Sequence, residues 1–127
     1  PINGRIAARF GESRDMGDLT WRGILLAAPV GRTIRAVARG RAVYSGWLHG
    51  FGMLLILDHG DGYMTLYGYN QAVFPQVGDR VEAGQPVGTV GDTGDTPQSG
   101  VYFEIRHNGK PHDPLLWCRV AGAGDHK

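Results

Sequence analysis

The sequence predicts a mostly β domain built from short antiparallel strands, and three observations lead to this prediction. Stretches of β-branched and aromatic residues with alternating polarity recur along the chain, whereas helical periodicity is scarce. The 21 glycines follow no fixed period, which is typical of many tight turns between strands. A length of 127 residues is enough to bury one hydrophobic core, so a single domain is expected.

Eight strands are predicted in chain order, and each is a short run of strand-forming residues. They cover residues 5–10, 23–28, 33–38, 40–47, 53–58, 64–69, 86–90 and 101–107. Asp61-Gly62 and Asn108-Gly109 are turn dipeptides that join strands in a hairpin or mark the end of one. Gly78 and Gly84 bracket a further short strand. The domain is expected to span residues 1–118, with a flexible C-terminal tail over residues 119–127 that is rich in Ala and Gly.

Composition excludes several classes of function. The formal net charge of +1 gives no reason to expect a nucleic acid as partner. No apolar run approaches the roughly 20 residues that span a bilayer, so membrane insertion is not expected. The single cysteine, Cys118, excludes an internal disulfide and a CxxC metal site, but it does not distinguish between compartments.

No catalytic residue, metal ligand set or cofactor is predicted from the histidines, serines and cysteine. The five histidines lack the i, i+2 or i, i+4 spacing of a zinc site; they are His49, His59, His107, His112 and His126. His59, at a strand exit in Asp58-His59-Gly60, is expected to have a structural hydrogen-bonding role. Ser13, Ser45 and Ser99 have no histidine near them in the sequence, and Cys118 lies in an apolar stretch typical of packing.

Eight landmarks, taken in order, resemble the LytM domain of lysostaphin-type metallopeptidases. The landmarks are residues 21–29, 31–40, 50–52, 58–60, 67–70, 78–88, 91–94 and 101–106. The resemblance covers about residues 1–118 and implies an antiparallel β-sheet with a central groove, hairpins and little helix.

The same resemblance implies that the metal site has degenerated. Active members of the family hold zinc with a His-x-x-x-Asp motif and the second histidine of a His-x-His motif, and the matching positions here are Trp21, Leu25 and Tyr102. The catalytic histidines match Tyr69 and Gly100. An indole N–H has no lone pair to offer and leucine has no donor atom. With a reference pKa of about 10, tyrosine is a poor ligand at neutral pH. The chain is therefore expected not to be an enzyme.

The positions around the lost metal site are predicted to form a partner-binding groove. It is apolar and aromatic with arginines at its edges, a composition typical of protein-binding hot spots. The predicted groove residues are Trp21, Arg22, Leu25, Phe51, Leu54, Tyr67, Tyr69, Tyr102 and Arg106. The alternative is that Trp21 and Leu25 only fill the space left by the metal.

Finer details of the sequence are similar to the murein hydrolase activators within this family. The matching stretches are residues 21–23, 66–71, 102–106 and 108–111, followed by Pro114 and Trp117. The resemblance implies a non-catalytic, periplasmic activator of zinc-dependent N-acetylmuramoyl-L-alanine amidases in septal peptidoglycan splitting, whose groove binds the regulatory helix of the amidase. It also implies a link to the FtsEX division complex through an N-terminal coiled coil that this sequence does not include. The alternative is a pseudoenzyme module that binds peptidoglycan through the same groove.

One cluster of charge remains outside this interpretation. Arg32, Arg35, Arg39 and Arg41 fall within ten residues that contain no acidic residue. They are either solvated positions on the outer faces of strands, with their aliphatic stems packed on apolar neighbours, or a contact for an anionic wall polymer or partner.

Overall fold

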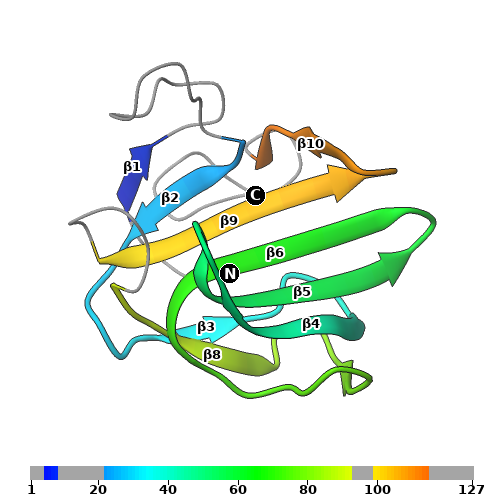
Figure 1. Cartoon of the computed structure of the whole chain (residues 1–127), viewed down its shortest axis with the longest axis horizontal. Coiled ribbons are helices and arrows are strands. Elements are labelled where there is room, and N and C mark those ends of the chain that lie inside the picture. The colour runs from blue at the N-terminus through cyan, green and yellow to red at the C-terminus, as the bar shows by residue number, and fades with distance from the viewer. Residues whose placement is uncertain (1–4, 9–21, 93–98, 115–127) are drawn as a thin grey trace.

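The computed structural model describes residues 5–8, 22–92 and 99–114, and these residues form an antiparallel sheet (Figure 1). The strands are β1 (Arg5–Ala8), β2 (Ile24–Ala27), β3 (Thr33–Arg35), β4 (Gly40–Leu48), β5 (Gly52–Gly60), β6 (Tyr63–Val73), β7 (Arg80–Val81), β8 (Pro86–Val90), β9 (Gly100–His107) and β10 (Lys110–His112). Their main order is β1-β2-β9-β6-β5-β4-β7. β10 pairs with β9, and β8 pairs with both β6 and β3. The prediction of a mostly β, antiparallel fold is confirmed.

Each predicted strand has a counterpart, and the differences lie mainly at strand ends. β6 continues to Val73, four residues beyond the predicted end, and β7 is the short strand expected between Gly78 and Gly84. β10 was not predicted, because Pro111 lies at its centre and proline cannot donate a ladder hydrogen bond. The predicted tail over residues 119–127 lies outside the described residues. Within the described residues, no helix has the length and apolar character needed to cross a membrane.

Two tight turns set the register of the hairpins. Asp61 and Gly62 have φ angles of 54° and 82°, and Asn108 and Gly109 have φ angles of 52° and 83°. Two consecutive residues with positive φ match the right-handed twist of the flanking strands, which is why Asp-Gly and Asn-Gly are favoured there. These turns connect β5 to β6 and β9 to β10, so both dipeptides form hairpins, although the sequence left open whether each would do so or only end a strand.

The main hydrophobic core lies on one face of the sheet and is closed by β3 and β8. Every second residue of β9 contributes to it, and the neighbouring strands do the same. Its buried side chains include Ile24, Leu26, Ile34, Leu55, Leu57, Tyr67, Val81, Val87, Val90, Val101, Phe103 and Ile105.

A chain of hydrogen bonds crosses the edge of this core. The Tyr67 hydroxyl accepts from the backbone N–H of Val37 at 3.2 Å and is hydrogen-bonded to the Thr65 hydroxyl at 3.0 Å. Thr65 Oγ1 lies 2.6 Å from His59 Nε2, and His59 Nδ1 lies 2.7 Å from the Arg39 carbonyl oxygen. Both ring nitrogens of His59 therefore have partners, which confirms its predicted structural role.

A β-bulge in β6 decides which face each of its tyrosines occupies. Met53 pairs with Asn70 and Leu55 with Tyr67, so β6 has one residue more than β5 in this interval. Tyr69 has a φ angle of 66° at this point, and its N–H donates to the Phe51 carbonyl oxygen at 2.8 Å. The extra residue reverses the alternation of the strand. Tyr67 consequently packs in the main core, whereas Tyr69 packs on the opposite face.

Replacing Tyr67 with phenylalanine should destabilise the domain by about 1–2 kcal/mol, because it leaves the Val37 N–H without its partner and removes one of the two hydrogen bonds of the Thr65 hydroxyl. Urea denaturation measures this difference. Tyr44→Phe is the matched control, since the Tyr44 hydroxyl makes an exposed hydrogen bond to the Trp47 carbonyl oxygen. Equal losses of stability in the two variants would contradict a structural role for the buried chain.

Candidate functional site

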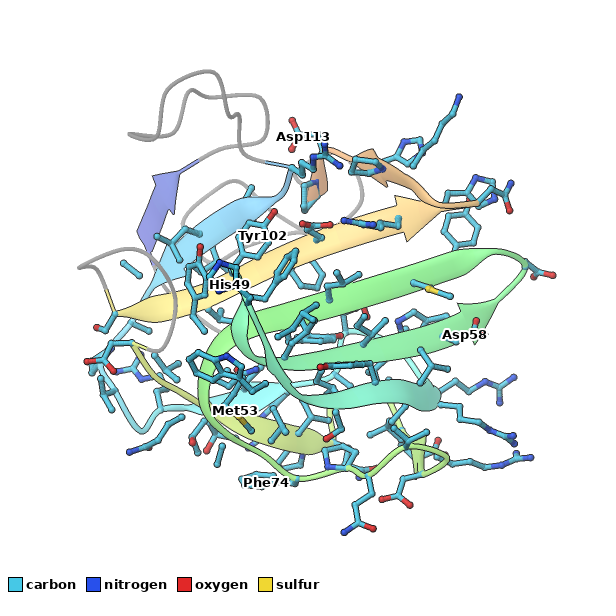
Figure 2. The ribbon with its side chains drawn as sticks, viewed as in Figure 1. His49, Met53, Asp58, Phe74, Tyr102 and Asp113 are labelled. Carbon is cyan, nitrogen blue, oxygen red and sulfur yellow. The ribbon has the colours of Figure 1, made fainter. Side chains whose placement is uncertain are left out.

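A second, smaller cluster of buried side chains lies on the other face of the sheet. It contains Leu25 from β2, Tyr69 from β6 and Tyr102 from β9, which are 2%, 1% and 3% exposed, with half-buried Phe51 packed against them. We call these four residues the aromatic cluster. Phe51 comes from the turn between β4 and β5, which reaches across β6 toward β9 (Figure 1). Figure 2 shows His49 of this turn next to Tyr102 in projection.

The backbone around Tyr102 explains how its ring fits. Leu25 and Gly68 are its Cα partners on the two neighbouring strands, β2 and β6. A Cβ atom on Gly68 would lie 3.5 Å from Tyr102 Cδ2 and 3.2 Å from the Phe51 carbonyl oxygen. Glycine therefore leaves the room into which the tyrosine ring and the β4–β5 turn pack.

The rings of the aromatic cluster contact one another at favourable distances. The Tyr102 ring centroid lies 5.6 Å from that of Tyr69, with 27° between the ring planes. It lies 5.9 Å from that of Phe51, with 44° between the planes. Offset or tilted pairs at such distances contribute about 0.5–1.5 kcal/mol beyond their buried area.

A fully buried carboxylate, Glu104, adjoins the aromatic cluster. The Tyr102 hydroxyl donates to Glu104 Oε2 at 2.5 Å, and Arg106 Nε donates to Glu104 Oε1 at 2.7 Å in an ion pair. The three residues alternate along β9 and therefore share one face. A buried carboxylate is tolerated only when its charge is paired and its oxygens are hydrogen-bonded, and both conditions hold here.

Glu104 was missed as a site residue in the sequence, although a signal for it was present. An acid between Tyr102 and Arg106 at i, i+2 and i+4 of a strand shares their face, which favours pairing. Gly23 completes its surroundings, since a Cβ atom there would lie 2.8 Å from Glu104 Cγ and 2.1 Å from the Phe103 carbonyl oxygen.

The other predicted groove residues are divided among several places. Arg22 is exposed and Arg106 is 28% exposed at its side chain, so both remain accessible. Leu54 is fully buried but belongs to neither cluster. Tyr67 does not lie near the groove as expected, because the bulge at Tyr69 directs it into the main core. Trp21 lies outside the described residues.

The chemistry of the aromatic cluster suits packing and recognition and does not fit the zinc site of the resembling metallopeptidases. Leu25 has no donor atom, and the Tyr102 hydroxyl is bonded to Glu104. Among the residues described, no three His, Cys, Asp or Glu side chains form a group that could hold a metal ion.

The fold and this site define a lysostaphin-like β-sheet domain with aromatic and apolar packing at the expected metal positions. A sequence model of peptidase family M23 matches residues 19–114, and the chain belongs to that family. The antimicrobial peptidase lysostaphin from Staphylococcus simulans superimposes with a TM-score of 0.84 at 26% identity, over 96% of this chain and 52% of that one.

Two curated relatives carry names that bear on function. The murein hydrolase activator EnvC of Escherichia coli (strain K12) is 40% identical over 117 residues, which cover 92% of this chain and 28% of EnvC. The murein hydrolase activator NlpD of the same strain is 38% identical over 118 residues, which cover 92% of this chain and 30% of NlpD. The chain thus spans less than a third of the length of these relatives.

Replacing Arg106 with glutamine should destabilise the domain, because it removes the charge partner of a fully buried carboxylate. Breaking a buried ion pair costs about 3–5 kcal/mol, and solvent screening of the partly exposed Arg106 reduces our expectation to about 2 kcal/mol. Chemical denaturation measures the loss. Arg22→Gln, an exposed change of the same charge, is the control and should cost less than about 0.5 kcal/mol.

The double variant Arg106→Gln/Glu104→Gln should recover part of that stability, since a neutral amide leaves no buried charge while still accepting from Tyr102. If the double variant is as unstable as the sum of the two single variants, the ion pair does not couple the two residues.

Proposed function

We propose that this chain is a non-catalytic activator of zinc-dependent N-acetylmuramoyl-L-alanine amidases, acting in the periplasm during septal peptidoglycan splitting. The observation that carries the proposal is the direct pairing of Leu25 with Tyr102 across β2 and β9. These are two of the positions at which the resemblance places zinc ligands in active peptidases. The similarity to EnvC and NlpD, both named murein hydrolase activators, supports the assignment of this chain as an activator.

The non-catalytic part of the proposal depends on the ligand chemistry. Catalytic zinc sites use three protein ligands and leave one position open for the water that the metal acidifies. Leucine and a tyrosine whose hydroxyl is bonded to Glu104 cannot supply two of those ligands. The strands that would present a metal are instead joined by the packing of Leu25 and Tyr69 on Tyr102, and the Glu104 hydrogen bonds hold the Tyr102 side chain in place along β9.

The surface around the aromatic cluster is suited to an amphipathic helix of the amidase. Leu25, Tyr69 and Tyr102 are at most 3% exposed and form a rigid base, so a partner first meets the rim. Half-buried Phe51 belongs to this rim, and exposed Arg22 lies just before β2, the strand that carries Leu25. The hairpin that carries Phe51 also exposes Trp47 and Leu48, at 59% and 40%. Apolar helix residues would pack on these side chains, and acidic ones would pair with Arg22.

Activation would then be a shift in the population of the amidase from its closed to its open state. Binding the regulatory helix outside the amidase cleft stabilises the open amidase only by the difference in affinity between its two states. A difference of about 2.7 kcal/mol changes the ratio of open to closed amidase about a hundredfold. The activator therefore needs no chemistry of its own.

A peptidoglycan-binding module is the alternative use of the same surface, and the burial of the tyrosines favours it less. Sugar recognition by aromatic residues needs an open ring face. The rings of Tyr69 and Tyr102 are instead stacked on each other and almost inaccessible. Sedimentation of the chain and of its Phe51→Ala variant with purified sacculi distinguishes the two functions, since a module that binds peptidoglycan through the aromatic cluster should lose sacculus binding in the variant, whereas an activator should not.

Dye release from labelled peptidoglycan tests the proposal with the chain alone, an amidase alone and the two together. We expect release above the amidase level only in the mixture, with no stoichiometric zinc in the chain by metal analysis. Release by the chain alone that a chelator abolishes would overturn the non-catalytic assignment.

The docking surface is tested in the same assay by Phe51→Ala and Arg22→Glu. Each should raise the concentration of the chain needed for half-maximal stimulation about tenfold or more. The first variant removes an apolar contact, and the second reverses a charge at the rim. Val77→Ala is the control, since Val77 is 64% exposed on the loop between β6 and β7. Full stimulation by both rim variants would show that the amidase docks elsewhere.

A further inference from the structure

A cavity of about 530 Å³ lies where β4, β5 and β7 meet. Its charged lining consists of Arg39, Arg41 and Arg80 together with Asp58 and Glu82. In Figure 2, Asp58 lies at the end of β5 that is remote from His49 and Tyr102, so the cavity and the aromatic cluster occupy opposite ends of the sheet. We call this site the arginine cavity.

The strand register brings two arginines directly opposite each other in the arginine cavity. Arg41 and Arg80 are Cα partners in the antiparallel pair of β4 and β7. Like charges at directly opposed positions destabilise a sheet. Within the described ranges, the ion pair that the structure shows is Arg106 with Glu104, and none of the three cavity arginines lies within 4.0 Å of a carboxylate oxygen. Three arginines thus line one cavity without an ion pair to a carboxylate.

Neighbouring groups of the cavity are already occupied by bonds to the backbone. Asp58 Oδ1 accepts from the Gly60 N–H at 2.9 Å, and His59 is bonded to the Arg39 carbonyl oxygen. A Cβ atom on Gly40 would lie 2.7 Å from the Asp58 carbonyl oxygen, so the close approach of β4 to β5 at this point requires glycine. The cavity volume of about 530 Å³ leaves room for a ligand beside these bonds.

The charges that line the arginine cavity indicate the chemical class of the ligand that it binds. A planar guanidinium binds carboxylates and phosphates through two parallel hydrogen bonds. Three arginines against Asp58 and Glu82 leave a small positive excess, and the two acids would repel a densely charged polyphosphate. They would instead accept from amino or amide N–H groups. We propose that the arginine cavity binds the carboxylate of a short peptide that also carries amino or amide donors, the chemistry of a wall stem peptide.

The arginine cluster in the sequence only partly indicated this site. Arg39 and Arg41 line it, whereas Arg35 donates to the Gly84 carbonyl oxygen at 3.0 Å and neither Arg35 nor Arg32 is among its lining residues. Arg80, the third member, is 39 residues after Arg41 in the sequence and joins it only through the pairing of β7 with β4.

Titration of the labelled chain by NMR tests this proposal with three probes. They are a muropeptide with free peptide carboxylates, the same muropeptide with its carboxylates amidated, and inorganic phosphate. We expect the first to shift the backbone amides of residues 39–41, 58–60 and 80–82, and the other two to bind at least tenfold more weakly. Equal binding of the amidated probe, or tighter binding of phosphate at the same residues, would overturn the carboxylate assignment.

Arg41→Gln and Arg80→Gln should each weaken binding of the free muropeptide about tenfold, and neither should lower thermal stability, because each removes a repulsion. Lys110→Gln, which changes the net charge equally at an exposed residue of β10, should weaken this binding less than twofold. Equal weakening by Lys110→Gln would mean that the loss of muropeptide binding reflects only the change in net charge, and it would overturn the assignment of binding to the arginine cavity. Binding of the amidase, measured without peptidoglycan, should be unchanged in Arg80→Gln, so the failure of this proposal is distinguishable from the failure of the proposed function.

Discussion

The alternation of side chains along β9 is the constraint on which both faces of the sheet depend. β9 lies between β2 and β6, and it sends Val101, Phe103 and Ile105 into the main core. The residues that alternate with them, Tyr102, Glu104 and Arg106, are therefore directed to the other face. A shift of one residue in this register would exchange the two sets and bury the charged pair in the main core. Packing of the main core thus sets the register of β9, and this register places Tyr102, Glu104 and Arg106 on the opposite face.

Glu104 shows how such a site can be rigid without a metal. In a metalloprotein the ion holds ligands from separate strands in one geometry, and part of the folding free energy comes from that coordination. Here the carboxylate binds Tyr102 on one oxygen and Arg106 on the other, while Leu25 and the neighbouring rings pack around the tyrosine. The desolvation of a buried carboxylate opposes folding, so this arrangement favours one defined geometry more than it favours stability. A preformed surface of this kind lowers the ordering entropy lost when a partner binds.

The features of the fold and of the candidate site that could be predicted from the sequence are those that depend on residues close together in the chain. Strand periodicity and the Asp-Gly and Asn-Gly turns are local, and they located the two turns and every strand except β10. The position of Tyr67 could not be predicted, because the bulge that separates it from Tyr69 depends on pairing with β5 and on the contact with Phe51. The opposition of Arg41 and Arg80 likewise exists only once β7 has paired with β4. The sequence indicated which residue types would gather, whereas the register decided which of them meet.

The two proposed sites, the aromatic cluster and the arginine cavity, lie toward opposite ends of one sheet. β5 links them, since it begins next to Phe51 at the aromatic cluster and ends with Asp58 and Gly60 at the arginine cavity. Between these ends Leu55 and Leu57 are fully buried in the main core, so the strand is held along its length. A well-packed strand transmits little change of shape unless it has two discrete arrangements, and the hydrogen-bonded register leaves no such alternative here. The two sites should therefore act as independent surfaces held at a fixed separation, and a domain so built can bring a protein partner and a wall peptide together in one orientation.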